Sequence, residues 1–465
     1  MKTMKEIRRS ALALAIVLLA AQTGYAAVSA DDARALGATL TKFGAEAQGN
    51  SDGSIPAYDG GLKNPPTVGK DRYPDPFAGE KPLYVVDGKN LAKYEAMLTP
   101  GTAEMLRRYP DYHLNVYPTH RTISYPDWFL ENTVKNATTA KLAGEVEGDK
   151  VVGAAPDGYP FQGVPFPIPR NGLEVMWNNN LRFSPPVTLL RSRSWLVDTG
   201  GTPNELPGIQ AAYMNPFSEQ SGELRKKAHD SYFAFQTSLY SPSTSAGVQF
   251  LNFYKVDSAA PAPIWIYTPG QRRVRKAPEF AYDIPMSSYA GVLLWDEPWG
   301  FVGRMDRFDF KLVGKKELIV PYNVFGVTNQ KTSEEVLGKS TVNPDAVRWE
   351  KRRVWVVEAT RKNGVRHVYS KRNFYIEEDS WAMVSTESFD NAGKLWRVAY
   401  LYTFPAYNIG GLNNNTWSFN DLLKGNYTVI NTGRNEPGNY VRSYQREEGL
   451  NIPFTPQAIA GGSVR

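Results

Sequence analysis

From about Gln249 onward, apolar and polar residues alternate along the chain with a period of two. Such alternation is typical of β-strands that bury one face. Turn-forming residues separate the runs at Val313–Lys315, Lys362–Gly364 and Asp390–Gly393, as hairpin connections require. The pattern therefore predicts an antiparallel meander. Its clearest strands are expected at Leu251–Val256, Ile264–Thr268, Phe308–Val313, Glu317–Val320 and Arg353–Thr360.

Helical patterns precede this meander. Ser29 is expected to cap a short helix, Thr99 with Pro100 to begin a later one, and Pro126–Ala143 to form a third. The fold class expected is mainly β with helices (α+β). Residues 27–150 are assigned to amino-terminal helices and an extended segment, and residues 151–465 to a curved antiparallel sheet. No break in composition divides the sheet, so both parts are expected to form one domain.

Residues 1–26 have the pattern of a cleavable secretory signal. Lys2, Lys5, Arg8 and Arg9 precede the apolar run Ala11–Ala21, and small residues that suit a cleavage site follow it. The run is too short for a membrane-spanning helix, which needs roughly 20 residues. The chain contains no cysteine, so a lipid-modified amino-terminal cysteine is excluded. We therefore expect a periplasmic protein that is exported and is not lipid-anchored.

Residue patterns of known catalytic sites are absent from the sequence. There is no Gly-x-Ser-x-Gly motif, and the four histidines lack the spacing of a helical metal site. Asp306 with Asp309, or Glu377–Asp379, could act as acid and base on a sugar, but solvated strand ends and turn caps are the favoured interpretation. We expect no enzyme activity, no cofactor and no metal. The net charge of +6 is mild and gives no reason to expect nucleic-acid binding.

The most unusual stretch for ligand binding is Trp265–Pro278, where arginines alternate with apolar residues close to aromatic rings. A basic stripe of this kind could hold an anionic head group while the rings cover its apolar part. Alternatively, the arginines pair with Asp306, Glu317 or Glu358. The ligand-binding residues expected are Trp265, Tyr267, Arg272, Arg273, Arg275 and Tyr282.

A second candidate is Gly163–Pro169, a stiff apolar stretch that contains three prolines. It is expected either to cap a hydrophobic cavity or to cross the interior as a buried loop. The sequence does not choose between these two roles.

Short motifs that cover nearly the whole chain after the signal match one family. They are Leu40-Thr41, Gly44–Glu46, Gly53–Ala57, Val164–Pro169, Asn171–Glu174, Trp177-Asn178, Pro269–Pro278, Tyr282-Asp283, Leu312–Glu317, Pro321–Asn323, Arg353–Ala359 and Leu395–Val398. In these motifs the chain resembles a family of large, uncharacterised periplasmic proteins of Gram-negative bacteria that are related to outer-membrane lipoprotein sorting. The stretch Trp295–Gly303 departs from the acidic pattern of that family.

The resemblance implies a fold similar to the carriers LolA and LolB. Such a fold is a half-open antiparallel barrel with helices over its concave side, which holds lipid chains. It implies a carrier for a lipid or another hydrophobic molecule, with a resistance-nodulation-division (RND) type inner-membrane transporter and an outer-membrane protein as partners. The lack of cysteine makes a diffusible, LolA-like role the better match. Two alternatives stay open: an envelope glycan-binding protein or hydrolase, and a structural adaptor between envelope machines.

Overall fold

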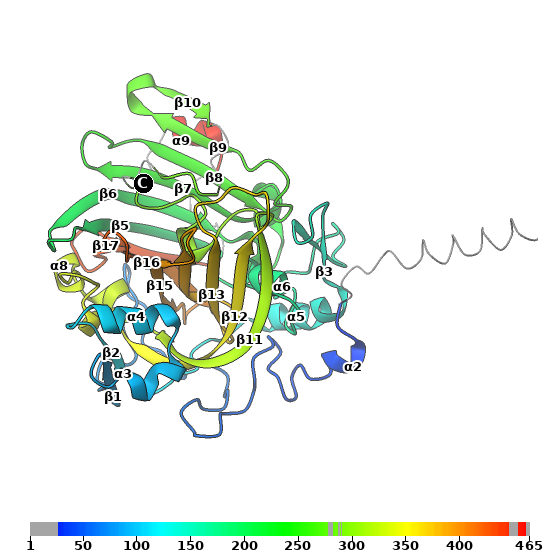
Figure 1. Cartoon of the computed structure of the whole chain (residues 1–465). Helices are drawn as coiled ribbons and strands as arrows, with labels where there is room; N and C mark the ends of the chain where they lie inside the picture. Colours follow the sequence, from blue (N-terminus) through cyan, green and yellow to red (C-terminus); the bar gives the residue numbers. More distant parts are fainter. Residues whose placement is uncertain (1–26, 278–281, 287–288, 290, 446–453, 462–465) are drawn as a thin grey trace, which may run out of the picture.

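The computed structural model describes residues 27–277, 282–286, 289, 291–445 and 454–461, so the expected signal lies outside the described residues. A large curved sheet dominates the structure, and helices lie against both of its faces (Figure 1). The strands are β1 (Tyr84–Asp87), β2 (His113–Val116), β3 (Lys141–Ala143), β4 (Lys150–Val152), β5 (Val187–Val197), β6 (Pro203–Met214), β7 (Ser231–Ser241), β8 (Gln249–Lys255), β9 (Ile264–Thr268), β10 (Arg273–Lys276), β11 (Phe308–Pro321), β12 (Trp349–Arg361), β13 (Lys371–Glu377), β14 (Met383–Phe389), β15 (Leu395–Pro405), β16 (Leu412–Asp421), β17 (Asn426–Thr432) and β18 (Tyr440–Tyr444).

The helices are short, and none in the described part of the chain has the length and apolar character needed to cross a membrane. They are α2 (Ala30–Ala33), α3 (Leu91–Tyr94), α4 (Pro100–Arg108), α5 (Asp127–Thr139), α6 (Gly172–Leu181), α7 (Glu223–Lys227), α8 (Ser333–Val336) and α9 (Pro456–Gly461). The expected starts of α2 and α4 are confirmed, because Ser29 caps the first and Thr99 with Pro100 begins the second.

The main sheet contains 16 strands in the order β1-β2-β12-β13-β14-β15-β16-β17-β5-β6-β7-β8-β9-β10. Strand β11 pairs with β12, and β18 pairs with β5. All pairs are antiparallel except β2 with β12, which run parallel at Val116 and Trp349. Strands β1 and β10 form the two edges, so the sheet does not close on itself. This confirms the expected half-open, mainly β architecture and adds two strands from the amino-terminal 27–150 segment.

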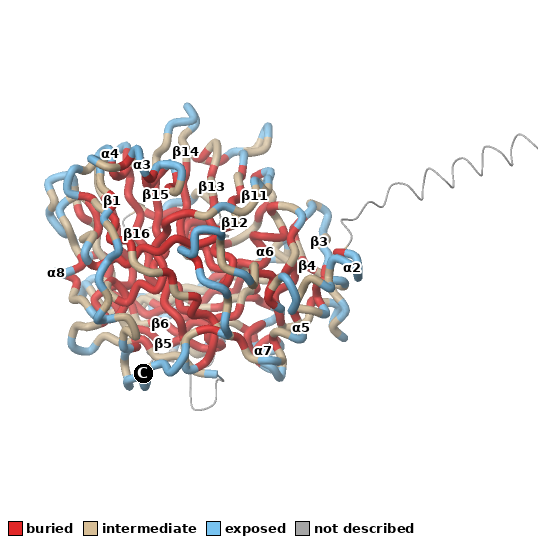
Figure 2. The backbone as a smooth tube through the Cα atoms, turned by 90° about the horizontal axis from the view of Figure 1, so that it is seen from below, coloured by how far each residue is buried: buried red, intermediate tan, exposed pale blue. Residues whose placement is uncertain are grey.

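The two faces of the sheet carry separate cores. We call the face that packs against α6 the inner face, and the opposite one the outer face. On the inner face, buried side chains of α5 and α6 share one apolar cluster with β11–β16. On the outer face, α3 and α4 cover β15 and β17, and α9 covers β8 and β9. Figure 2 shows that buried residues run through the strands while exposed ones gather in the connections.

The expected hairpin turn at Val313–Lys315 is wrong, because β11 continues through these residues. The register against β12 shifts between Leu312 and Gly314, which marks a bulge. Gly314 has φ +129°, a conformation that glycine adopts in a bulge as readily as in a turn. The expected strands Phe308–Val313 and Glu317–Val320 are therefore one bent strand.

The sheet also begins before Gln249, since β5, β6 and β7 precede that residue. Most of their residues are buried on both faces, so the sequence shows no clean alternation there.

The cluster Glu377–Asp379 is not a solvated turn cap, because all three side chains are buried between β12, β13 and the amino-terminal segment. Arg352 donates to Glu377 at 2.6 Å and to Asp379 at 2.7 Å. Arg121 donates to Asp379 as well. The pair of Arg121 with Asp379 fixes the chain after β2 to the sheet. The backbone N–H of Glu46, in the segment that precedes β1, donates to Glu378 at 3.2 Å and fixes that segment as well.

Of the two roles expected for Gly163–Pro169, the structure shows the buried crossing loop. The side-chain amide of Asn178 in α6 accepts from the backbone N–H of Phe166 and donates to its carbonyl, at 2.9 and 2.6 Å. The hydroxyl of Thr133 in α5 accepts from the N–H of Val164 at 2.9 Å. Hydrogen bonds therefore hold this loop against both α5 and α6 on the inner face of the sheet.

Candidate functional site

Three adjacent cavities lie on the inner face, where the described residues between Tyr282 and Gly303 (282–286, 289 and 291–303) cross β6, β7 and β8. The ring of Trp299 lines two of them, and that of Trp295 lines two. One cavity is apolar, one is rich in asparagine and one is mixed. Their shared walls make this region the strongest candidate for a binding site in the described structure.

The apolar cavity encloses about 50 Å³ of free space. It is bounded by three strands of the sheet, by the crossing segment and by one ring of β16. Its lining residues are Ile209, Tyr213, Phe235, Thr237, Leu239, Phe250, Tyr254, Met286, Tyr289, Leu293, Trp295, Pro298, Trp299 and Trp417. A concave, mostly aromatic surface with few polar groups is typical of a site for a hydrophobic ligand.

Trp299 separates the apolar cavity from the asparagine-rich one. It lies in the single turn Pro298–Gly300 and has φ +54°, an unusual conformation for a bulky residue. Its ring centroid lies 4.6 Å from that of Phe233 and 5.3 Å from that of Trp417. Its indole N–H donates to Asn415 Oδ1 at 3.3 Å. These contacts hold a strained residue in place at the junction of the two chambers.

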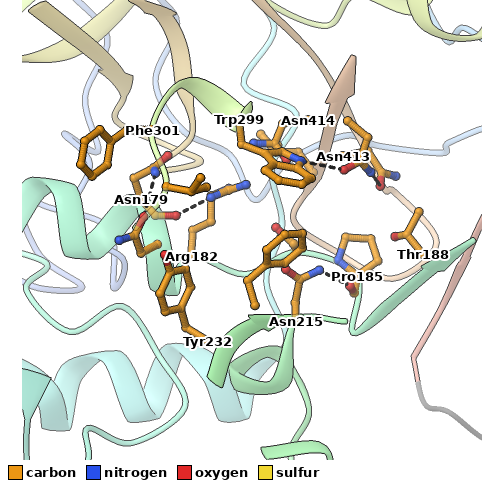
Figure 3. A pocket seen from close by; sticks show the side chains of 16 residues that line it. Asn179, Arg182, Pro185, Thr188, Asn215, Tyr232, Trp299, Phe301, Asn413 and Asn414 are labelled. Atoms are coloured by element: carbon orange, nitrogen blue, oxygen red, sulfur yellow. Dashed lines mark hydrogen bonds between the residues drawn. The ribbon is translucent and has the colours of Figure 1, made fainter. Parts of the chain in front are cut away.

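The asparagine-rich cavity encloses about 40 Å³ and is drawn in Figure 3. Two sequence triplets contribute to it: Asn178–Asn180 supplies two side chains from the end of α6, and Asn413–Asn415 supplies three from β16. Its lining residues are Asn179, Asn180, Arg182, Ser184, Pro185, Thr188, Asn215, Tyr232, Phe233, Trp299, Phe301, Val302, Leu412, Asn413, Asn414 and Asn415.

Arg182 is the one cation among the described residues that line this cavity, and its side chain extends toward the ring of Trp299 (Figure 3). Its Nη1 donates to the carbonyl of Asn179, whereas its buried Nε has no hydrogen-bond partner among the described residues. Burial lowers the pKa of Arg182 to about 10, so the side chain stays charged at neutral pH. Within the described parts of the chain, no carboxylate forms an ion pair with it. The arrangement leaves a partly buried positive charge, with a buried Nε, beside a polar chamber.

The mixed cavity encloses about 100 Å³ and lies next to Tyr282. The Tyr282 hydroxyl donates to Asp306 at 3.0 Å, and Arg304 pairs with Asp149 at 2.7 Å. Burial and the charge of Asp306 raise the pKa of Tyr282 to about 12. This predicted site residue is therefore neutral at physiological pH and is fixed at the wall of a cavity.

The other predicted site residues lie on the β9–β10 hairpin at the edge of the sheet. Trp265 and Tyr267 point to the outer face, where they pack with Phe253 and α9. Arg275 lies opposite Ile266 in the register, so it points to the inner side, as does Arg273. Arg272 lies in the turn with φ +48°. The expected single surface of rings beside arginines is not formed, because a period of two places them on opposite faces.

The alternative pairing of these arginines with strand acids is wrong. Asp306 binds Arg304 and Tyr282, while Glu317 pairs with Lys351 at 3.0 Å. Glu358 pairs with Lys371 at 3.6 Å. Arg272, Arg273 and Arg275 are exposed, and none of them has an ion pair with a described residue. Whether they contact a ligand stays a prediction.

The sequence reasoning missed Arg182, Trp299 and the asparagines. The two Asn triplets are visible in the sequence, and an unusual repeat of amide side chains was the one signal that could have indicated the polar chamber. Nothing in the sequence shows that the two triplets meet. They do so because β16 lies beside β15 and β17 at the centre of the sheet, facing the end of α6.

Comparison with known proteins identifies the family of this chain. The model of DUF1329, described as a protein of unknown function, matches residues 85–460. The chain belongs to the DUF1329 family. It is also 38% identical over 474 residues to an uncharacterized protein of Pseudomonas aeruginosa, and the match covers 100% of both chains. The family inferred from the motifs is thereby confirmed.

Solved structures related to this DUF1329 protein share little sequence with it. An outer membrane lipoprotein-sorting protein domain from Vibrio parahaemolyticus is 13% identical with a TM-score of 0.41, covering 62% of this chain and 98% of the other. A DUF1329 protein from Desulfovibrio piger is 13% identical with a TM-score of 0.39, and the match covers 59% of this chain and 92% of the other. A LolA superfamily protein from Nitrosomonas europaea is 8% identical with a TM-score of 0.32, and the match covers 57% of this chain and 91% of the other.

Proposed function

We propose that this protein binds and carries a hydrophobic molecule, a lipid or a compound of similar character, in the apolar cavity of the inner face. The observation that carries the proposal is the aromatic lining of that cavity on the inside of a half-open sheet. No covalent chemistry is required, because binding rests on the burial of apolar surface. Surface ring platforms for glycans find no support: every tryptophan of the chain lies in the described part, and none is exposed.

The free volume of the apolar cavity sets a condition on binding. About 50 Å³ is a third of the volume of an engineered apolar cavity of ~150 Å³ that binds benzene. A longer ligand therefore has to displace side chains of the crossing segment, and the rings of Trp295 and Trp299 are the largest of these.

The cellular setting is also part of the proposal. A signal at residues 1–26 directs the chain to the periplasm, and the absence of cysteine leaves it without a lipid anchor. The resemblance to lipoprotein carriers favours a diffusible shuttle that serves an RND-type inner-membrane transporter and an outer-membrane partner.

Native mass spectrometry of the protein purified from its own periplasm, followed by organic extraction, tests the carrier function. We expect a copurifying hydrophobic molecule at near-unit occupancy. A mass without ligand, together with no uptake of added hydrophobic molecules, would overturn the proposal.

A pair of substitutions locates the ligand. Leu239→Trp fills the apolar cavity and should abolish occupancy, whereas Leu423→Trp introduces the same bulk at an exposed position that lines none of the three cavities and should not. If Leu239→Trp does not fold, Leu239→Ala enlarges the cavity and should raise occupancy. Equal occupancy in all variants would place the ligand elsewhere.

A further inference from the structure

We infer that the ligand is an amphipathic anion whose carboxylate head is held by Arg182 in the asparagine-rich cavity, while its apolar body occupies the neighbouring apolar cavity. This inference rests on the proposed carrier function and specifies the class of ligand. Its basis is the pairing of two chemically opposite chambers across one side chain, Trp299.

The asparagine-rich cavity presents unused hydrogen-bond donors. Three buried nitrogens in its wall, Arg182 Nε, Asn180 Nδ2 and Asn414 Nδ2, have no partner among the described residues. A buried donor without a partner costs about 1–3 kcal/mol, so such groups in a native structure require an explanation. A carboxylate supplies only acceptors and can receive several donors at once. It therefore suits this wall better than a neutral head group, which brings donors of its own.

Charge balance supports the same conclusion. Two buried arginines of the inner face are neutralised within the protein: Arg372 pairs with Asp296 at 2.9 Å, and Arg397 pairs with Glu297 at 2.7 Å. An unpaired buried charge is unfavourable, so proteins normally supply a counter-ion. Arg182 departs from this pattern at a place where a cavity lies beside it. An anionic ligand would supply the missing charge.

Arg434 shows that the cavity, and not the lack of a carboxylate partner alone, distinguishes Arg182. Arg434 is more deeply buried than Arg182, its pKa is likewise lowered to about 10, and within the described structure it too has no carboxylate partner. Its Nη1 donates to the carbonyl of Thr328, and it lines none of the three inner-face cavities. It is therefore a suitable control for the loss of a buried guanidinium.

The size of the chamber favours a small head. A water molecule needs roughly 10–15 Å³ of such space, so about 40 Å³ admits on the order of three water-sized groups. The carbon and two oxygens of a carboxylate match this room. A phosphate with its substituents is larger, and we therefore commit to a carboxylate.

Titration of the delipidated full-length mature protein with hexadecanoate and with hexadecan-1-ol tests the inference. The two probes share a chain and differ in charge. We expect hexadecanoate to bind at least about tenfold more tightly than hexadecan-1-ol, because a charge-assisted hydrogen bond to Arg182 contributes free energy of that size. Arg182→Met should remove this preference and leave the affinity for the alcohol unchanged. Arg434→Met should keep the preference.

A second variant covers the case in which Arg182→Met does not fold. Asn414→Asp places a carboxylate in the same cavity, where it should neutralise Arg182 internally and abolish the preference for hexadecanoate. Equal binding of both probes by the wild type would overturn the inference while leaving the carrier function intact. Binding of neither probe would overturn the carrier function itself. Tighter binding of hexadecyl phosphate than of hexadecanoate, or loss of the preference in Arg434→Met, would overturn the assignment of a carboxylate to Arg182.

Discussion

Arg121 and Asp379 are 258 positions apart, yet the Arg121 guanidinium donates to both carboxylate oxygens of Asp379, at 3.0 and 2.6 Å. Both side chains are almost fully buried. Arg352 binds the same carboxylate from β12, so two guanidinium groups share one acid. The pair fastens the chain before α5 to the turn between β13 and β14.

Removing one partner of this pair should destabilise the protein strongly. In Arg121→Met, Asp379 loses one of its two counter-ions, and breaking a buried ion pair costs about 3–5 kcal/mol. Urea unfolding followed by tryptophan fluorescence measures the loss. Arg34→Met breaks the exposed pair with Asp31 and should have no measurable effect. Similar free energies of unfolding for both variants would contradict the structural role of the buried pair.

The same cluster predicts a dependence of stability on acid. Burial raises the pKa of Asp379, but Arg121 and Arg352 outweigh burial and hold that pKa below its ordinary value. An acid with a lowered folded pKa stabilises the fold above its unfolded pKa, near 3.9, and this stabilisation is lost as pH falls through the folded pKa. We expect the urea midpoint to fall steeply below about pH 4.

Asp379→Asn checks the assignment. It should be less stable than the wild type at pH 7 because its two arginines lose their acid. Its urea midpoint should also change less between pH 5 and pH 2 than that of the wild type. If the urea midpoint falls equally steeply with pH in both proteins, other carboxylates cause the acid sensitivity.

Gly44 should not tolerate a side chain. It has φ +93°, and a Cβ there would lie 1.9 Å from the carbonyl oxygen of Pro167. Gly44→Ala is expected to lose about 1–3 kcal/mol from overpacking in addition to backbone strain. Gly53→Ala has the strain alone, because Gly53 has φ +73° and no atom within 4 Å of its Cβ position. Gly44→Ala should therefore have the lower melting temperature when thermal unfolding of the two variants is compared. The reverse order would contradict the close approach of Gly44 to Pro167 in the crossing loop.

The exposed arginines of the β9–β10 hairpin should affect ligand uptake without affecting stability. Arg273→Ala combined with Arg275→Ala removes two solvated charges that have no ion pair in the described structure, so the unfolding midpoint should not change. Their charge should still attract an anionic ligand over a distance, and uptake of hexadecanoate should become slower and less dependent on salt. Stopped-flow titration at two salt concentrations measures this. Unchanged rates would remove the hairpin from the binding process.

Local signals predicted the parts of the fold that local chemistry determines. Thr99 caps α4 through its own side chain and Pro100 fits the first turn, so this helix was visible in the sequence. Helix α6 was missed because nearly all of its residues are buried, which removes the amphipathic period. A turn was wrongly predicted at Gly314 because a glycine between two alternating runs is typical of a bulge as well as of a turn.

The candidate site could not be predicted in the same way. Arg182 and Asn414 come from elements that are far apart in the sequence, and only the placement of β16 at the centre of the sheet brings them to one cavity. The sequence indicates a binding surface at Trp265–Pro278 because aromatic and basic residues are adjacent there. Adjacent residues on a strand point to opposite faces, so closeness in sequence was a poor guide to a shared surface.

The ion pair between Arg121 and Asp379 also constrains when the protein can reach its native state. At typical synthesis rates, the 258 residues between the partners take on the order of 10 to 50 s to appear, and Arg121 lacks its native carboxylate partner during that time. The neighbours β17 and β5 likewise join late residues to early ones. Contacts between such distant residues give a high contact order, for which slow folding is the rule. The nascent chain therefore spends a long period with its sheet incomplete, and this is the stage at which a chaperone that shields unpaired strands would benefit it most.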